Sequence, residues 1–241
     1  MAQWFRARVA DKQMLASKFL WVHLELVQPD RIEFTAGQYI MMRVPGLTGL
    51  RQYSISSAPS MNHGVELLVD IGPQGLGSKY LQELRPGDEV EFMGPGGRFV
   101  ITENTEGTEG TEEELWFVVT GSGISSIKSM ILDLLVDKKD TRPMWLHWGL
   151  RYPEDVFWFT ELAELAEEYD NFTFDPVLSK PNLGWKFCQG HVTECVVKHH
   201  TDFSGAAAYL CGNKGMIVEV SKILQDKGVT AERIHSEEYY G

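Results

Sequence analysis

The chain has 241 residues, of which 43% are hydrophobic and 23% are charged, and its formal net charge is −12. This length suits one large domain or two of about 100–140 residues each, and we expect two. No apolar run approaches the ~20 residues of a membrane span, no apolar stretch near the start resembles a secretory signal, and no basic stretch suits nucleic acid or acidic lipid. We therefore expect a globular, cytoplasmic protein.

Residues 1–102 contain short segments in which apolar and polar side chains alternate. In "FLWVHLELV" (19–27), Leu20, Val22, Leu24 and Leu26 share one face of a predicted strand. Similar runs stand at 38–44, 51–56, 65–71 and 88–94, and turns rich in glycine and proline separate them. This spacing predicts an antiparallel barrel or sandwich.

The segment "ENTEGTEGTEEE" (103–114) has six glutamates, no basic residue and no aliphatic side chain. Its charge is half of the net charge of the whole chain. Such a segment repels itself and buries little, so we predict a flexible, solvated linker. The expected domains are therefore residues 1–102 and 115–241, joined by 103–114.

After residue 114 the apolar pattern changes to strands that alternate with helices. The buried run "LWFVVT" (115–120) precedes Ile127, Met130, Ile131, Leu134 and Leu135, which recur at helical spacing. The same strand–helix order repeats three times in residues 144–228. It predicts an α/β domain with a parallel sheet that helices cover on both faces. His199 and His200 are expected at a helix end, where cations suit the dipole.

Cys188, Cys195 and Cys211 are the three cysteines of the chain. They are too few and too scattered for a disulfide framework, a zinc site or an iron–sulfur cluster, so no metal site is predicted. Cys188 and Cys195 are interpreted as packing residues.

Small and polar residues follow the predicted parallel strands, at the edge where such sheets bind ligands. Gly121 and Gly123 lie between a buried strand and a helix, a place suited to a pyrophosphate, although Ser126 replaces the third glycine of the dinucleotide motif. A simple tight turn explains these glycines equally well. Ser179 and Lys180 could hold a further phosphate, or Lys180 could be a solvated loop lysine.

The first half holds a second set of polar residues. Arg51, Tyr53 and Ser54 lie within four residues of one predicted strand, and Gly77 and Ser78 open a short amphipathic helix. Arginine and a helix N-terminus bind phosphates, and tyrosine can lie flat on a ring. Each piece also has a plain structural reading, as an edge arginine and as a serine cap. Together they suggest a flavin.

The order of these motifs resembles the ferredoxin–NADP reductase superfamily along nearly the whole chain. The matching segments are "RQYS" (51–54), "GLGSKYL" (75–81), "GPGGRF" (94–99), "TGSGISSIKSM" (120–130), "YLCGNKGM" (209–216) and "IHSEEY" (234–239). The family usually has Ala-Pro where this chain has Ser125-Ser126, which should leave the loop less rigid. Tyr240 and Gly241 follow Tyr239, so the resemblance leaves open which aromatic side chain covers the flavin. No fused [2Fe–2S] domain is expected.

The resemblance implies a set of site residues. FAD would be bound by Arg51, Tyr53, Ser54, Val69, Gly77, Ser78 and Tyr239. NAD(P) would be bound by Thr120, Gly121, Gly123, Arg151, Ser179, Lys180 and Gly212. Ser54, beside the flavin N5 atom, and Cys211 and Glu237, beside the nicotinamide, would be the catalytic residues.

The resemblance also implies an activity. NAD(P)H would give a hydride to FAD, and single electrons would pass to a separate carrier such as ferredoxin, flavodoxin or an oxygenase component. Two alternatives remain open: a reductase of free flavin or quinone, and a non-catalytic electron-transfer subunit. We expect NADPH to be preferred, because "LSK" (178–180) resembles the family's Ser-Arg pair for the 2′-phosphate and no acidic residue stands there; NADH remains possible.

Overall fold

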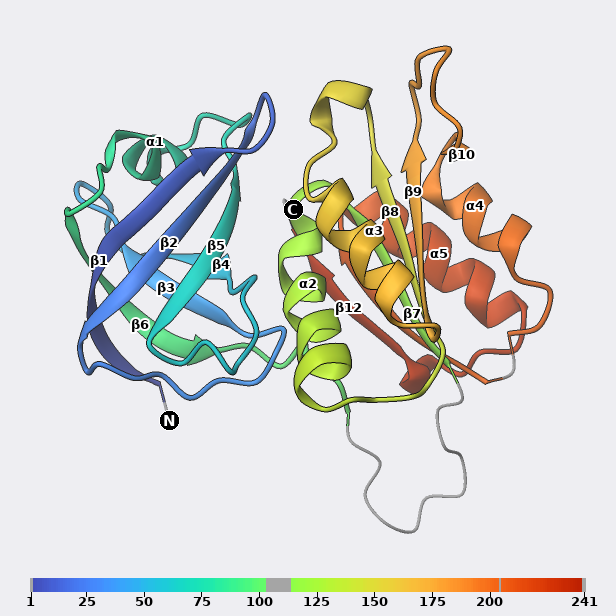
Figure 1. The fold of residues 1–241 in the computed structure, drawn as a ribbon, viewed down its shortest axis with the longest axis horizontal. Helices are drawn as coiled ribbons and strands as arrows, with labels where there is room; N and C mark the ends of the chain where they lie inside the picture. The colour runs from blue at the N-terminus through green and yellow to red at the C-terminus, as the bar shows by residue number, and fades with distance from the viewer. Residues whose placement is uncertain (1, 103–113, 204, 240–241) are drawn as a thin grey trace, which may run out of the picture. The chain divides into compact units, whose positions relative to one another are not determined.

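The computed structural model describes residues 2–102, 114–203 and 205–239 (Figure 1). The chain divides into two compact units, one formed by Met1–Ile101 with Ser125–Lys139 and the other by Thr102–Ile124 with Asp140–Gly241. Residues 103–113 of the predicted linker lie outside the described residues. Glu114, its last residue, is the first residue of a strand.

Among the described residues, no helix combines the length and the apolar character that a membrane span requires.

The first unit contains an antiparallel sheet. Its strands are β1 (Gln3–Met14), β2 (Phe19–Gln28), β3 (Tyr39–Arg43), β4 (Leu50–Ser54), β5 (Gly64–Asp70) and β6 (Glu89–Gly96), in the order β4-β3-β6-β1-β2-β5. The two edges meet beyond β4, where Ile55 bridges to Leu67 and the Ser56 N–H donates to the Glu66 carbonyl at 2.8 Å. The sheet therefore closes into a barrel, as the alternating pattern predicted.

The alternation of β2 sets the barrel core. Leu20, Val22, Leu24 and Leu26 are all buried and belong to one apolar cluster. The short helix α1 (Leu76–Glu83) adds Leu81 to the same cluster. The side chains that were predicted to share one face of a strand thus form the interior.

Helix α2 (Ile124–Leu132) continues as a π-helical turn over Asp133–Asp137. The residues predicted at helical spacing from Ile127 to Leu135 are all fully buried. Residues 125–139 pack with the barrel strands in the first unit. The sequence pattern predicted the helix and its buried face, but not that this face would complete the barrel unit.

The second unit contains a parallel sheet. Its strands are β7 (Glu114–Thr120), β8 (Met144–Leu150), β9 (Phe172–Leu178), β10 (Cys188–Gln189), β11 (Ala206–Gly212) and β12 (Ile234–Glu238), in the order β10-β9-β8-β7-β11-β12. Its helices are α3 (Phe159–Glu168), α4 (Val192–His199) and α5 (Lys214–Asp226), with short 3₁₀ turns at Gly121–Gly123, Pro153–Asp155 and Ala231–Arg233. Figure 1 shows α3 on one face of this sheet and the pair α4 and α5 on the other.

Strand β7 lies at the centre of the sheet and is buried on both faces. Its apolar residues from Leu115 to Val119 have no exposed surface. Trp116 and Val118 pack with Val196 of α4 and Val220 of α5 in one apolar cluster. A continuous apolar run is what a doubly covered parallel strand requires, so this part of the prediction is confirmed.

Two interpretations from the sequence are wrong. Cys188 and Cys195 form a disulfide, with their Cα atoms 6.5 Å apart. The pair forms because β10 turns at Gly190, which has φ of +108°, directly into α4. A spacing of seven residues gives no sign of this turn.

The second correction concerns the end of α4. The helix ends at His199, as predicted, but the next residue, His200, is buried against Trp116, with ring centroids 3.8 Å apart. Burial is the main cause that lowers the pKa of His200 to about 4, and the neighbouring His147 and His199 add to it. His200 is therefore neutral at pH 7 and is not a cation at the helix end.

Candidate functional site

In the barrel unit, β4 and the start of α1 lie against each other. A Cβ atom on Gly77 would lie 2.5 Å from the Tyr53 hydroxyl oxygen and 3.2 Å from Cγ of Arg51. The first turn of α1 can approach these side chains only because residue 77 has no side chain. Three residues predicted to bind flavin are thus brought together.

The N-terminus of α1 offers donors for a phosphate. In the part of the chain that the structure describes, no side chain caps this helix, and Ser78 is not its cap, because its hydroxyl donates to the Gly75 carbonyl at 2.9 Å. The first N–H groups of this helix therefore have no capping side chain, and they lie at the positive end of the helix dipole. Arg51 is exposed beside them. The arrangement fits a diphosphate.

Ser54 is buried at the end of β4, and its carbonyl accepts a hydrogen bond from the Ser125 hydroxyl at 3.0 Å. One turn later, the Ser129 hydroxyl donates to the Ser57 carbonyl at 2.7 Å. The serine at position 125, where the family usually has alanine, therefore makes a buried hydrogen bond to the end of β4. The side chain of Val69, the remaining barrel residue of the predicted set, lies in the core.

In the parallel-sheet unit, β7 ends at Thr120 and turns through Gly121, which has φ of +56°. A Cβ on Gly121 would meet no described atom within 4 Å, so its outer side is open. The Trp148 indole N–H donates to the Gly121 carbonyl at 3.1 Å and holds the turn from inside. Such an open turn lets a ligand reach the backbone.

The ends of β7 and β11 lie in direct backbone contact. A Cβ on Gly123 would lie 2.5 Å from the carbonyl oxygen of Cys211, and one on Gly212 would lie 2.1 Å from the Thr120 hydroxyl oxygen. That hydroxyl accepts from the Asn213 N–H at 3.2 Å. Three predicted nucleotide-binding residues, Thr120, Gly123 and Gly212, therefore lie together at one sheet edge with the predicted catalytic residue Cys211.

The last strand adds the predicted catalytic residue Glu237 to this edge, and Tyr239 directly follows that strand. Cys211 is directly opposite Glu237 in the register of β11 and β12, and the Tyr239 N–H donates to the Gly212 carbonyl at 2.8 Å. Cys211 is fully buried, whereas Glu237 and Tyr239 are half-buried. Tyr240 lies outside the described residues.

Arg151, Ser179 and Lys180 also come together. Backbone N–H groups of Ser179 and Lys180 donate to the carbonyls of Leu150 and Arg151 at 3.1 and 2.9 Å. The guanidinium of Arg151 and the ammonium of Lys180 both lie over the ring of Tyr152, at 5.3 and 5.7 Å from its centroid. Sequence reasoning missed Tyr152, although its place directly after Arg151 at a strand end was a usable signal.

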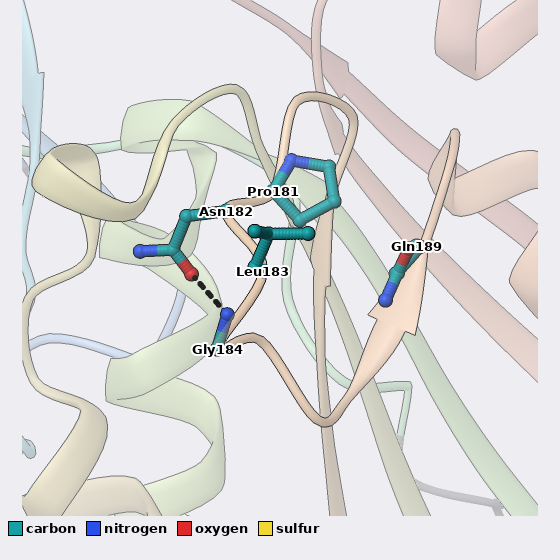
Figure 2. Close-up of a pocket in the computed structure, with 5 residues that line it drawn as sticks. All are labelled: Pro181, Asn182, Leu183, Gly184 and Gln189. Atoms are coloured by element: carbon teal, nitrogen blue, oxygen red, sulfur yellow. Dashed lines mark hydrogen bonds between the residues drawn. The ribbon is translucent and has the colours of Figure 1, made fainter.

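An open pocket of about 760 Å³ lies on the loop that follows Lys180 (Figure 2). It is lined by Pro181, Asn182, Leu183, Gly184 and Gln189. Within it, the Asn182 side-chain oxygen accepts from the Gly184 N–H at 3.1 Å. The pocket thus borders the predicted phosphate residues but contains none of them.

Replacing Gly123 by alanine should destabilise the protein, because the new methyl group would collide with the backbone of Cys211, which cannot move as a flexible side chain can. We expect a loss of about 1–3 kcal/mol in the free energy of unfolding in urea. Gly184→Ala is the matched control, since its Cβ would have only an ordinary contact at 3.6 Å. Equal stability of the two variants would contradict the close approach.

Ser125→Ala should cost about 1–3 kcal/mol in the same measurement, because it removes the buried hydrogen bond from the Ser125 hydroxyl to the Ser54 carbonyl. The exposed Ser60 provides the control variant Ser60→Ala, for which we expect almost no change. A Ser125→Ala protein as stable as the control would show that the hydrogen bond contributes nothing.

Comparison with known proteins agrees with this division of sites. Residues 6–101 match the oxidoreductase FAD-binding domain, and residues 117–222 match the oxidoreductase NAD-binding domain. The reductase component DmpP of a Pseudomonas phenol 2-monooxygenase is 34% identical over 98% of this chain and 65% of its own length. Ferredoxin–NADP reductase B of Sorangium cellulosum is 28% identical over 99% of this chain and 98% of its own length.

Solved structures agree as well. The reductase GcoB of Amycolatopsis has a TM-score of 0.88 and 27% identity, over 98% of this chain and 70% of its own. The chain spans just under two thirds of the length of the monooxygenase reductase components that it resembles. With both domain families matched in the same order as the two sets of site residues, the chain belongs to the ferredoxin–NADP reductase superfamily, as an FAD-binding β-barrel followed by an NAD-binding α/β domain.

Proposed function

We propose that the chain is a flavin-dependent NAD(P)H reductase that passes single electrons to a separate acceptor. The observation that carries this proposal is the presence of both sites in one chain: a diphosphate cradle beside Tyr53 in the barrel, and an open glycine turn at the ends of β7 and β11. A flavin site alone would suit a relay, and a nucleotide site alone would suit a dehydrogenase.

The barrel residues fit FAD. The first turn of α1 and Arg51 would bind the pyrophosphate, Tyr53 would lie on the isoalloxazine ring, and Ser54 would donate a hydrogen bond near N5. Bound FAD supplies the conversion between two-electron and one-electron transfer. Ser125 is then a positioning residue, because it holds the carbonyl of Ser54 and so fixes the end of β4.

The sheet edge fits a pyridine nucleotide. The open turn at Gly121 exposes backbone N–H groups to a pyrophosphate, and Cys211 and Glu237 would border the nicotinamide. The contribution of these residues is orientation and the exclusion of water, which lower the barrier without any proton transfer by the protein. Arg151, Ser179 and Lys180 would bind a 2′-phosphate, with Tyr152 holding the two cations in place.

For the acceptor we propose a small redox protein, such as ferredoxin or flavodoxin, or an oxygenase component. The names of the relatives support this choice, since they include reductase components of monooxygenases and a ferredoxin–NADP reductase. Reduction of free flavin or quinone is the alternative.

A rapid-mixing experiment tests the proposed function directly. When the purified, FAD-loaded protein is mixed with NADPH or NADH without oxygen, the flavin absorbance should bleach in a single turnover, because the nucleotide turn is open and complete. A non-catalytic relay subunit would keep its colour. Adding ferredoxin, flavodoxin or quinone to the bleached protein then identifies the acceptor by which of them restores the absorbance fastest.

Lys180→Ala should raise the KM for NADPH with little change for NADH, because only NADPH carries the 2′-phosphate. The expected loss is on the order of 1–3 kcal/mol, or about 5- to 150-fold in kcat/KM, as for one charged hydrogen bond. Lys222→Ala on the exposed side of α5 is the matched control. An equal loss with both nucleotides in Lys180→Ala would remove Lys180 from the phosphate site.

A cytoplasmic location is also proposed, and the Cys188–Cys195 disulfide is unusual for that compartment. Fractionation of the source cells, combined with trapping of free thiols, tests both points together.

A further inference from the structure

We propose that Cys188, Cys195, His199 and Asp175 form a redox-controlled zinc site, closed to metal while the disulfide is present and able to bind one Zn²⁺ ion when the disulfide is reduced. The site lies on the α4 face of the parallel sheet. None of its four residues belongs to the proposed nucleotide site, and the proposal does not depend on the proposed function.

The ligand atoms of three of these residues already converge. One ligand atom each from Asp175, Cys188 and His199 lie within 4.8 Å of one another. His199 Nδ1 and Asp175 Oδ2 are 3.5 Å apart. Two ligands at about 2.0–2.1 Å from a tetrahedral zinc ion lie about 3.4 Å apart, so this edge of the site is nearly formed.

Cys195 supplies the fourth ligand through the geometry of α4. It stands four residues before His199 on the same helix, so both side chains project from one face. Its sulfur is bonded to that of Cys188. Cys188 and Asp175 come from the neighbouring strands β10 and β9. One helix face and two adjacent strands therefore supply the S₂NO donor set that zinc accepts.

Two buried histidines hold the Asp175 carboxylate in a fixed orientation, as residues behind a metal ligand commonly do. His147 is fully buried, and its Nδ1 lies 2.9 Å from Asp175 Oδ2. Its Nε2 lies 2.9 Å from Nε2 of His200. Both contacts are hydrogen bonds if His200 donates to His147 and His147 donates to Asp175. Such a second layer fixes the orientation of a ligating carboxylate.

A metal ion can reach the proposed site from solvent on the side where His199 lies. The side chain of His199 is 31% exposed, whereas that of Asp175 is 9% exposed. An ion can therefore enter past His199 and reach ligands that are shielded from water. Shielding also strengthens the attraction between the ion and its charged ligands.

The switch follows from sulfur chemistry. Two electrons and two protons from a thiol reductant, which is oxidised to its own disulfide, convert the Cys188–Cys195 bond into two thiols. Binding of Zn²⁺ releases both protons and leaves two thiolates on the metal. Disulfide sulfurs carry no charge and are poor zinc ligands, so the oxidised form keeps only Asp175 and His199, which are too few. The 6.5 Å between the Cα atoms is near the wide end of the disulfide range, so the sulfurs can separate to the about 3.8 Å that two thiolates on one zinc require.

The test compares the oxidised and the reduced forms of the whole 241-residue chain, loaded with FAD. Each form is freed of reductant without oxygen and titrated with Zn²⁺ against a chromophoric chelator, and with Co²⁺ as a spectroscopic probe at wavelengths beyond the flavin bands. We expect one Zn²⁺ per reduced chain, at least about 100-fold weaker binding by the oxidised chain, and cobalt–thiolate absorption only after reduction.

Matched variants separate this site from other binding. Cys188→Ser and His199→Ala should lose tight binding, whereas Cys211→Ser and His63→Ala, which each remove the same residue type elsewhere, should keep it. The proposal fails if the reduced parent protein does not bind stoichiometric zinc, if Cys188→Ser binds as tightly as the parent, or if both redox forms bind equally. Thiol trapping that finds all three cysteines free in the air-oxidised protein would also overturn the switch.

Discussion

The approach of Gly123 to the carbonyl of Cys211 is the constraint on which the proposed nucleotide-binding edge of the sheet depends. No side chain fits between these two backbones, so the end of β7 and the end of β11 are held at a fixed separation. Gly212 meets the Thr120 hydroxyl in the same way from the other strand. These backbone contacts hold both sides of the open turn at Gly121 in place. A turn that is already ordered loses little conformational entropy when its N–H groups bind a ligand.

In the barrel unit, one glycine and two hydroxyl groups hold the proposed flavin residues in position. Gly77 lets the start of α1 touch Tyr53 and Arg51, while Ser125 and Ser129 donate to carbonyls just beyond β4. These hydrogen bonds are buried, and buried bonds hold geometry better than exposed ones because water does not compete for them. The departure from the family pattern at residue 125 therefore strengthens the end of the strand that carries the proposed flavin residues.

The two faces of the parallel sheet have different chemistry. The face toward α3 is apolar and aromatic, as in the contact of Phe159 with Phe174. The face toward α4 buries Asp175, His147 and His200 in one connected group beside a disulfide. Buried polar groups destabilise a fold unless they are satisfied. The hydrogen bonds that connect this group satisfy its buried polar atoms, and metal binding by the reduced thiols beside it is the role that we propose.

The sequence by itself determined the two architectures and the identity of most proposed site residues, because these rest on local patterns. Period-two alternation, continuous apolar runs and glycine positions are properties of short segments, and they indicated the barrel, the parallel sheet and the two turns that we propose bind phosphate. The tertiary structure alone decided which distant side chains meet. Contacts between separate segments decide the Ser125–Ser54 hydrogen bond, the contact of Lys180 with the Tyr152 ring, the Cys188–Cys195 disulfide and the neutral His200. The spacing of residues within one segment does not indicate such contacts, because each contact depends on how two segments that are distant in the sequence pack against each other.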